Sequence, residues 1–391
     1  MRNVFIAASA GLLFAAAPTA AQQKSVKIGF VSTFSGPTAV IGNDMRNSFE
    51  LALDQMGRKM GSLPVEVIYK DDQQKPEIGR QVTDELIESD QVDFVVGYIW
   101  SNVLLASLKP AVDSKTFIIG ANAGPSQIAG ELCSPYFFST SWQADQTPQA
   151  MGTYMNSKGV KTAFLIGPNY AAGKDMLAGM EATFAGKVVG RELTAWPSQL
   201  DFSAELAKAK AANPDAIFVF YPGNAGVQFL NQYAQAGLKD KIPLYTTFTI
   251  DELSLPLQKD LALGVPGAQE WVNDLPNPAN QIFVAAFEKK YSGHKPSFYG
   301  AQSYDAANLL ASAVGATNSN LGDKTAVRKA LEKADFKSVR GGFKFGNNHF
   351  PIQNFYLQEA VTDAKGGLAL KTVATIVNDS QDSFHDKCPM D

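Results

Sequence analysis

Short apolar runs alternate with amphipathic segments along most of this chain. Uninterrupted apolar runs without polar alternation are typical of strands that are buried on both faces of a parallel sheet. In the first part of the chain such runs predict strands at residues 26–31, 65–69, 94–96 and 117–119. Helices are predicted between them at residues 42–60, at 76–88 and after Ser101. In the first of these helices the apolar residues Met45, Phe49 and Leu53 repeat at helical spacing.

The same pattern starts again after Trp142. Strands are predicted at residues 162–166, 188–193, 216–220 and 244–247, and helices at 173–184, 203–212 and 225–236. Two βαβα series predict an α/β protein with two doubly wound domains, each with its ligand-binding loops at the carboxyl ends of its strands. If these two loop sets face each other, they form a cleft.

The last part of the chain is less regular. Helices are predicted at residues 280–291 and 303–316, and strands at 343–345 and 354–358, with a turn at 346–348 between the strands. The sequence contains no long linker of low complexity, so we expect short crossovers between the domains that act as hinges.

The first residues have the composition of a secretory signal peptide, residues 1–21. Arg2 precedes an apolar run over residues 4–17, and Thr19-Ala20-Ala21 suits cleavage before Gln22. The run is too short to span a membrane, and no cysteine follows the cleavage site to carry a lipid anchor. We therefore expect a soluble, exported protein.

Charge and size limit the function further. The 391 residues carry a formal charge of −4, which becomes −5 when Arg2 leaves with the signal peptide. This mild acidity argues against nucleic acid and anionic membrane surfaces as partners. The remaining length, about 370 residues, suits two domains of ordinary size.

Two cysteines remain in the mature chain, Cys133 and Cys388. Because an exported chain permits their pairing, we predict a disulfide that ties the C-terminal tail to the first domain. The alternative is two unpaired thiols. The three histidines, His294, His349 and His385, have no i,i+4 spacing and lie in polar, loop-like contexts. We therefore expect no metal site.

Signatures of enzymes are missing from the sequence. There is no nucleophile elbow, no phosphate loop and no dinucleotide fingerprint after the first strand. The adjacent Asp71 and Asp72 follow a strand and point to opposite faces, so strand-end solvation or hinge contacts explain them better than an acid pair. We expect a protein that is not an enzyme, has no catalytic residues and needs no cofactor.

The loops after the strands favour an anion as the ligand. Glycines at the strand–helix turns and the helix N-termini behind them direct N–H groups towards the same cleft. Ser101 adds a hydroxyl donor there, or alternatively is a plain helix N-cap. Trp100 beside it forms either ordinary packing or the wall of a pocket.

Several stretches of this chain carry a resemblance to a known family. They are KIGFVSTFSGP at 27–37 followed by IGNDM, YKDDQQKP at 69–76, VVGYIWS at 95–101, IIGANAGP at 118–125, SWQADQ at 141–146, FVFYPGNAGVQFLNQYAQAGL at 218–238 and SYDAANLL at 303–310. With them the chain resembles a type I periplasmic solute-binding protein of an ABC transporter, of the branched-chain amino acid (leucine/isoleucine/valine) class.

The resemblance implies two lobes that are joined by three crossover hinge segments and close on a ligand. Lobe 1 is expected to comprise residues 22–142 and 273–350, and lobe 2 residues 143–272 and 351–391, with the tail tied back to lobe 1. It also implies a monomer in the periplasm whose partners are a small carboxylate ligand and an ABC-transporter permease in the inner membrane.

In lobe 1, Ser101 matches the serine that holds the ligand's α-carboxylate in amino-acid binders of this family. The loop Ala121-Asn122-Ala123 matches a second ligand loop, which offers a backbone carbonyl and N–H groups. The family usually has Ser or Thr where this chain has Ala123. The loss of that hydroxyl weakens the amino-acid interpretation.

Lobe 2 departs from the family at two positions. In the turn at residues 169–173, Tyr170 matches the family but Ala172 stands where a ligand-facing tyrosine is expected. Phe248 stands where an acidic residue pairs with the ligand's ammonium, although a shift of the alignment makes Asp251 or Glu252 that residue. An unpaired buried ammonium costs several kcal/mol.

These departures favour a carboxylate that has no amine and an aromatic body, such as a benzoate or a phenylpropenoate. Trp100 and Phe248 are expected to wall the pocket, and Asn224 is expected to bond a ring substituent. Further wall candidates are Tyr98, Phe34 and Trp271. The alternatives are a branched-chain or other amino acid, or a ligand-sensing module of the same fold.

Overall fold

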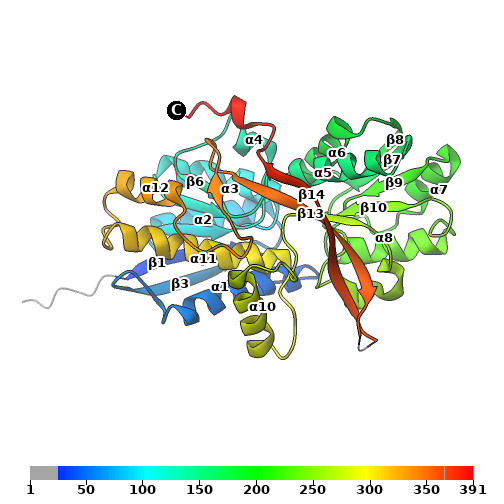
Figure 1. Cartoon of the computed structure of the whole chain (residues 1–391). Helices are drawn as coiled ribbons and strands as arrows, with labels where there is room; N and C mark the ends of the chain where they lie inside the picture. The colour runs from blue at the N-terminus through cyan, green and yellow to red at the C-terminus, as the bar shows by residue number, and fades with distance from the viewer. Residues whose placement is uncertain (1–24, 365, 391) are drawn as a thin grey trace, which may run out of the picture.

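Two α/β lobes lie side by side in the computed structural model of the chain (Figure 1). The structure describes residues 25–364 and 366–390, so the predicted signal peptide at residues 1–21 lies outside the described residues. Within those ranges no helix has both the length and the apolar character that a membrane span requires.

The first lobe contains a six-stranded sheet in the order β2-β3-β1-β4-β5-β6. Its strands are β1 (Val26–Ser32), β2 (Lys59–Met60), β3 (Leu63–Asp71), β4 (Phe94–Gly97), β5 (Phe117–Gly120) and β6 (Phe137–Ser139). All neighbours are parallel except β2 and β3. Because β1 lies between β3 and β4, the strand order reverses there, and ligands of such sheets bind at the carboxyl ends of the strands at that point.

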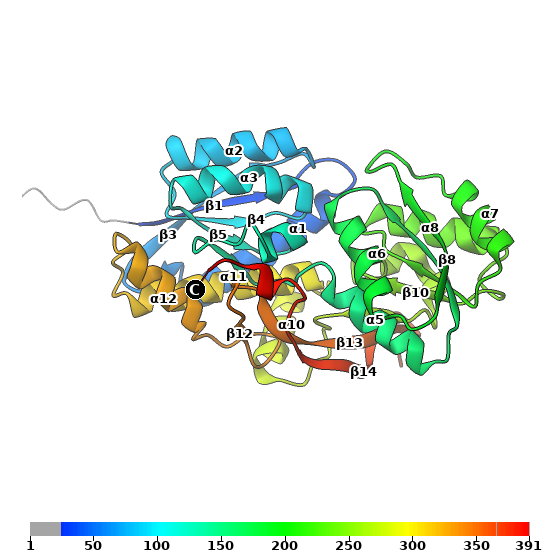
Figure 2. The same ribbon diagram turned by 90° about the horizontal axis from the view of Figure 1, so that it is seen from above.

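Helices cover both faces of this sheet. They are α1 (Ala39–Gln55), α2 (Pro76–Glu88), α3 (Ser101–Asp113), α4 (Ser126–Ala129), α10 (Pro278–Lys290), α11 (Phe298–Ala316) and α12 (Lys324–Lys333). Figure 2 shows α2 and α3 on one face of the sheet and α1 and α11 on the other. The last three helices come from the end of the chain, so the lobe is completed by residues far apart in sequence.

The second lobe contains a sheet in the order β12-β13-β11-β10-β9-β7-β8, and β14 pairs with β13. Its strands are β7 (Thr162–Pro168), β8 (Lys187–Thr194), β9 (Ala216–Val219), β10 (Leu244–Thr247), β11 (Gly267–Gln269), β12 (Lys344–Phe345), β13 (Pro351–Thr362) and β14 (Leu368–Ser380). Its helices are α5 (Gln146–Ser157), α6 (Ala171–Thr183), α7 (Ser203–Ala212), α8 (Asn224–Gln235), α9 (Leu255–Gln258) and the 3₁₀ turn η1 (Lys259–Ala262). A second 3₁₀ turn, η2 (His385–Lys387), belongs to the C-terminal tail and lies against the first lobe. The strand order reverses at β7, which lies between β8 and β9.

The doubly wound pattern predicted from the sequence is confirmed, with differences in individual elements. The first helix ends at Gln55, five residues earlier than predicted, because Gly57 and Arg58 adopt positive φ and turn the chain into β2. The predicted strand at 354–358 is the middle of the longer β13, which forms a hairpin with β14. Eight elements were not predicted, namely the helices α4, α5, α9 and α12 and the strands β2, β6, β11 and β14.

The C-terminal tail is joined to the first lobe by the Cys133–Cys388 disulfide, as predicted, so the alternative of two unpaired thiols is wrong. His349 lies in the turn between β12 and β13, as its predicted loop-like context requires, but it is buried rather than surrounded by solvent. Its ring is 4% exposed and stacks on Phe138 with 3.9 Å between the centroids. Burial lowers the pKa of His349, and its ring nitrogens contact the Phe137 carbonyl at 2.9 Å and Glu332 Oε1 at 3.3 Å.

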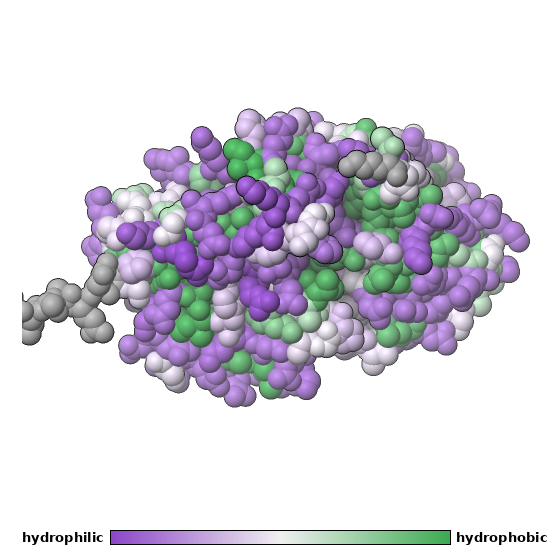
Figure 3. All heavy atoms as spheres, turned by 90° about the horizontal axis from the view of Figure 1, so that it is seen from below, coloured by the Kyte–Doolittle hydropathy of each residue, from purple (hydrophilic) through white to green (hydrophobic). Residues whose placement is uncertain are grey.

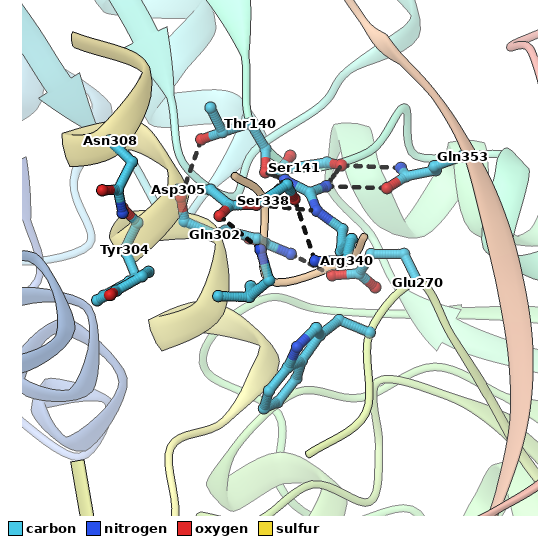
Figure 4. A network of polar contacts seen from close by, with 12 residues as sticks. Thr140, Ser141, Glu270, Gln302, Tyr304, Asp305, Asn308, Ser338, Arg340 and Gln353 are labelled. Carbon is cyan, nitrogen blue, oxygen red and sulfur yellow. Dashed lines mark hydrogen bonds and ion pairs between the residues drawn. The ribbon is translucent and has the colours of Figure 1, made fainter. Parts of the chain in front are cut away.

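The chain passes between the lobes three times, at residues 140–145, 270–277 and 334–343, and one buried arginine of the third crossover joins it to the first (Figure 4). The Arg340 guanidinium donates to the carbonyl oxygens of Thr140 and Ser141 on the first crossover. It also donates to Gln353 Oε1 at 2.8 Å and pairs with Asp305 of α11 at 3.1 Å. Asp305 is fully buried and Arg340 nearly so, so this pair is hardly screened by solvent.

The outer surface contrasts with this interior. The face in Figure 3 is mainly hydrophilic, with separate hydrophobic areas. The most exposed large apolar side chains, Leu257, Ile282 and Val373, come from α9, α10 and β14. Single apolar residues scattered over a surface are normal.

We predict that Arg340→Met destabilises the protein by about 3–5 kcal/mol, because it leaves Asp305 buried without its cation. Urea denaturation followed by circular dichroism measures this change. Lys333→Met is the matched control, since its pair with Asp335 is exposed, and it should leave the denaturation midpoint unchanged. If the urea midpoint of Arg340→Met equals that of the control, the buried Arg340–Asp305 pair does not contribute to stability as we propose.

Candidate ligand-binding site

A small cavity lies where the two strand-order reversals face each other. Its lining comes from both lobes and from the crossovers, and consists of Ile99, Trp100, Ser101, Asn122, Trp142, Tyr170, Ala172, Phe220, Pro222, Phe248, Phe298 and Tyr299. The space left for a water-sized molecule is about 10 Å³, close to the minimum for one water. A larger ligand therefore enters only when these rings or the lobes move apart.

Aromatic rings from the two lobes meet across this cavity. Trp100 of the first lobe lies 5.5 Å from Trp196 and 6.4 Å from Tyr170 of the second, measured between ring centroids. Phe248 lies 4.8 Å from Phe298 in the same way and stacks on Trp142 at 4.7 Å. These contacts bring the lobes together in a closed arrangement whose centre is aromatic.

A chain of two hydrogen bonds fixes the indole nitrogen of Trp100. Its Nε1–H donates to Thr33 Oγ1 at 2.9 Å, and that hydroxyl donates to Asp72 Oδ1 at 2.5 Å. Burial raises the pKa of Asp72 to about 6. The neighbouring Asp71 accepts from the Phe34 N–H, so both carboxylates make contacts at the end of the strand, but Asp72 is buried and not solvated as the sequence had suggested. Trp100 is therefore packed at its edge and also lines the cavity.

Ser101 is the first residue of α3, and the N-cap position is Trp100. The alternative of Ser101 as a plain N-cap is therefore wrong. The side chain is 1% exposed and its Oγ has no hydrogen-bond partner within the described part of the chain. A buried hydroxyl without a partner costs free energy, so this donor is available to a group that enters the cavity.

Two further polar atoms of the lining share this property. Asn122 Nδ2 donates to the Ile99 carbonyl at 2.8 Å, while Asn122 Oδ1 has no partner among the residues that the structure describes. Trp142 Nε1 likewise has no acceptor among them. Asn122 is 5% and Trp142 3% exposed, so water outside the protein hardly reaches either side chain.

No carboxylate belongs to the described lining of the cavity. Asp251, one alternative for the acidic residue, accepts from the N–H groups of Leu253 and Ser254 and closes a turn. Glu252, the other alternative, accepts from Asn273 Nδ2, and burial raises its pKa to about 8. Phe248, and not an acidic residue, lines the cavity at this place.

Phe248 directly follows β10 and has a φ of 54°. A positive φ is unusual for a bulky residue and is held only when the surroundings demand it. The conformation turns the chain sharply and presents the ring to Trp142 and Phe298. Burial raises the pKa of Tyr170 and Tyr299 above the usual range, so both hydroxyls stay protonated.

Six of the nine ligand-binding residues predicted from the sequence line the cavity together: Trp100, Ser101, Asn122, Tyr170, Ala172 and Phe248. Ala121 and Ala123 are buried outside the lining, and their N–H groups donate to the carbonyls of Gly97 and Tyr98. Asn224 lies at the start of α8 in a separate groove beside Pro37 and Val40. These three residues do not face the cavity in this closed arrangement.

The weaker wall candidates have other contacts. The Tyr98 hydroxyl bonds that of Thr83, Phe34 packs against Tyr69, and Trp271 Nε1 donates to Asn280. Ile99 and Pro222 also line the cavity and belong to loops that follow predicted strands, whereas Trp142, Phe220, Phe298 and Tyr299 were not predicted from the sequence. Trp142 marked the start of the second series, which was a signal. Phe298 and Tyr299 begin a helix far along the chain, and no sequence pattern indicated that they line the cavity.

A polar contact also bridges the two lobes. Asp175 of α6 accepts from the Ser126 N–H and from Ser126 Oγ, each at 2.9 Å, at the start of α4. Burial raises the pKa of Asp175. Because its partners belong to the opposite lobe, this contact exists only when the lobes are together.

Comparisons with known proteins agree with this architecture. A family model described as periplasmic binding protein matches residues 25–367, so the chain belongs to the periplasmic binding protein family. It is of the type I fold and the branched-chain amino acid class. The family consists of solute receptors of ABC transporters, which implies an extracytoplasmic location.

Three relatives illustrate the range of the similarity. A Leu/Ile/Val-binding protein homolog from Brucella melitensis is 27% identical, with 95% of this chain and 96% of the relative covered. A solute-binding protein from R. palustris in complex with benzoate is 30% identical, covers 94% of this chain and 100% of its own, and has a TM-score of 0.88. One from Rhodopseudomonas palustris BisB5 with 3,4-dihydroxy benzoic acid is 28% identical, covers 92% and 99%, and has a TM-score of 0.84.

We predict that Asp175→Ala weakens the binding of a cleft ligand by about tenfold or more, because it removes two hydrogen bonds that only the closed form makes. Calorimetric titration of the two proteins with the same ligand measures the ratio. Asp201→Ala is the matched control, since Asp201 accepts from the Ser203 N–H within one lobe. Equal affinities of all three proteins would show that the contact does not contribute to closure.

Proposed function

We propose that this protein is a periplasmic receptor that binds a small aromatic carboxylate and delivers it to an ABC-transporter permease. One observation carries the proposal: the cavity between the lobes is lined by aromatic rings and unpaired hydrogen-bonding atoms but, within the described chain, by no carboxylate. An acid without an amine suits such a lining, because an ammonium here has no counter-charge.

The proposed roles follow from the chemistry of each residue. Ser101, at the positive end of the α3 dipole, holds the carboxylate. Trp100, Tyr170 and Phe248 enclose the ring, since flat aromatic faces bury much apolar area against a flat ligand. Ala172 leaves space beside them, because its side chain is a single methyl group.

The relatives support this ligand class and also the alternative. The R. palustris protein with benzoate is 30% identical and similar over nearly the whole chain. The Brucella relative is named as a Leu/Ile/Val-binding protein homolog, which favours an amino acid. The aromatic lining without a carboxylate favours the acid over the amino acid.

The remaining parts of the proposal concern the cell. The signal peptide at residues 1–21 directs export, and the mature chain acts in the periplasm as a monomer. It needs no cofactor and makes or breaks no bond. Its protein partner is the permease in the inner membrane.

We predict that benzoate or a phenylpropenoate raises the melting temperature of the mature protein while leucine does not, because a ligand stabilises the folded state that binds it. A thermal-shift screen with both groups of compounds tests this directly. Stabilisation by leucine alone would overturn the aromatic-acid proposal in favour of an amino-acid receptor.

We also predict that Ser101→Ala weakens carboxylate binding by about 1–3 kcal/mol, as expected for a hydrogen bond to a charged group. Isothermal titration with benzoate measures this loss. Ser107→Ala serves as a comparison, since Ser107 is buried in the same helix as Ser101 but does not line the cavity. An unchanged affinity of Ser101→Ala would remove Ser101 as the anchor.

A further inference from the structure

The unpaired polar atoms of the cavity differ in whether they donate or accept a hydrogen bond. Trp142 Nε1–H is a donor only, and Ser101 Oγ can donate or accept. Asn122 contributes an oxygen, Oδ1, because its Nδ2 is committed to the Ile99 carbonyl at 2.8 Å. Turning this amide over would place two oxygens against each other, so its orientation is determined by that bond.

Asn122 is also held firmly in place. Its carbonyl oxygen accepts from Ser141 Oγ at 2.7 Å on the first crossover, and the side chain is 5% exposed. Asn122 Oδ1 therefore presents a fixed acceptor that neither bulk water nor a described residue of the protein satisfies. A site with such an acceptor rejects a ligand that has no donor to offer it.

A carboxylate alone does not satisfy this set of atoms. Its oxygens can accept from Trp142 Nε1 and from Ser101 Oγ, but facing Asn122 Oδ1 they would meet another acceptor. The ring C–H groups of an unsubstituted aromatic acid leave this oxygen unpaired as well. The lining therefore suits a ligand that accepts hydrogen bonds from Trp142 Nε1 and Ser101 Oγ and donates one to Asn122 Oδ1.

The donor on the ligand must be uncharged. An ammonium would also bond Asn122 Oδ1, but within the described lining no carboxylate balances its charge. A hydroxyl donates without bringing a charge into the aromatic cavity. This requirement separates hydroxylated aromatic acids from both amino acids and plain benzoate.

Resting on the proposed function, we infer that Asn122 determines specificity among aromatic acids while Trp142 helps to anchor their carboxylate, so that the receptor selects an aromatic acid bearing a neutral hydroxyl. The hydroxyl donates to Asn122 Oδ1. The carboxylate accepts from Trp142 Nε1 beside Ser101. Trp142 also stacks on Phe248, so its indole serves as a wall and as a donor at once.

Calorimetric titration with matched probes tests this inference. The probes are benzoate, the ortho-, meta- and para-hydroxybenzoates, and the corresponding methoxybenzoates, which keep the oxygen but lose the donor. We expect one hydroxybenzoate to bind about tenfold or more tightly than both benzoate and its methoxy analogue. This series needs only the natural protein, so it stands even if a variant does not fold.

Two variants separate the roles. Asn122→Leu should abolish the preference for the hydroxyl while benzoate still binds, and Trp142→Phe should weaken every aromatic acid by about the same factor. Asn102→Leu is the matched control, because Asn102 Oδ1 also has no partner within the described chain but lies outside the cavity lining. It should leave the preference unchanged.

The outcomes distinguish this inference from the proposed function. Equal binding of benzoate, methoxybenzoates and hydroxybenzoates would overturn the selection by Asn122 and leave the aromatic-acid receptor intact. A hydroxyl preference that survives in Asn122→Leu would also overturn it. Binding of leucine with no response to any aromatic acid would overturn both.

Discussion

The buried ion pair between Arg340 and Asp305 holds the crossovers of this protein in register. Asp305 belongs to a helix of the first lobe, and Arg340 reaches from the third crossover to the carbonyls of Thr140 and Ser141 on the first. Gln353 receives a bond from the same guanidinium and donates to the Ser141 carbonyl. Since a charge cannot remain unpaired in such a buried place, these segments hold a common position. Trp142 follows Ser141 on the first crossover and lines the cavity. The contacts of Arg340 and the cavity therefore share one short segment of the chain.

The cavity combines two kinds of constraint. Aromatic rings from both lobes fill it so closely that little more than a water fits. Among these rings, Ser101, Asn122 and Trp142 each contribute a buried polar atom that the described residues leave unpaired. Native proteins rarely bury such atoms without a purpose, because each costs free energy. Closure of the lobes, supported by Asp175 and Ser126, becomes favourable when a ligand pairs these atoms.

The fold was largely readable from the order of apolar runs, because strands buried on both faces admit few polar residues. The errors lie where a local signal was weak. Gly57 and Arg58 ended the first helix through positive φ, and β14 alternates too irregularly to be recognised. In the site, Trp100 and Ser101 were predictable from a strand tip followed by a helix. Asn224 was wrongly included among the residues of the site, because its loop follows a strand. Its side chain lines another groove.

The sequence by itself determined the class of protein, the disulfide partners and the loops that carry the site, since these depend on residue types and their order along the chain. It also indicated that an aromatic ring replaces an acid at Phe248. Only the tertiary structure decided which loop residues face the cavity. Ala121 and Ala123 direct their N–H groups to neighbouring backbone, whereas Asn122 between them lines the cavity. That choice depends on which partners lie within hydrogen-bonding distance, and Tyr299 and Trp142 reach the same cavity through packing between segments far apart in the chain.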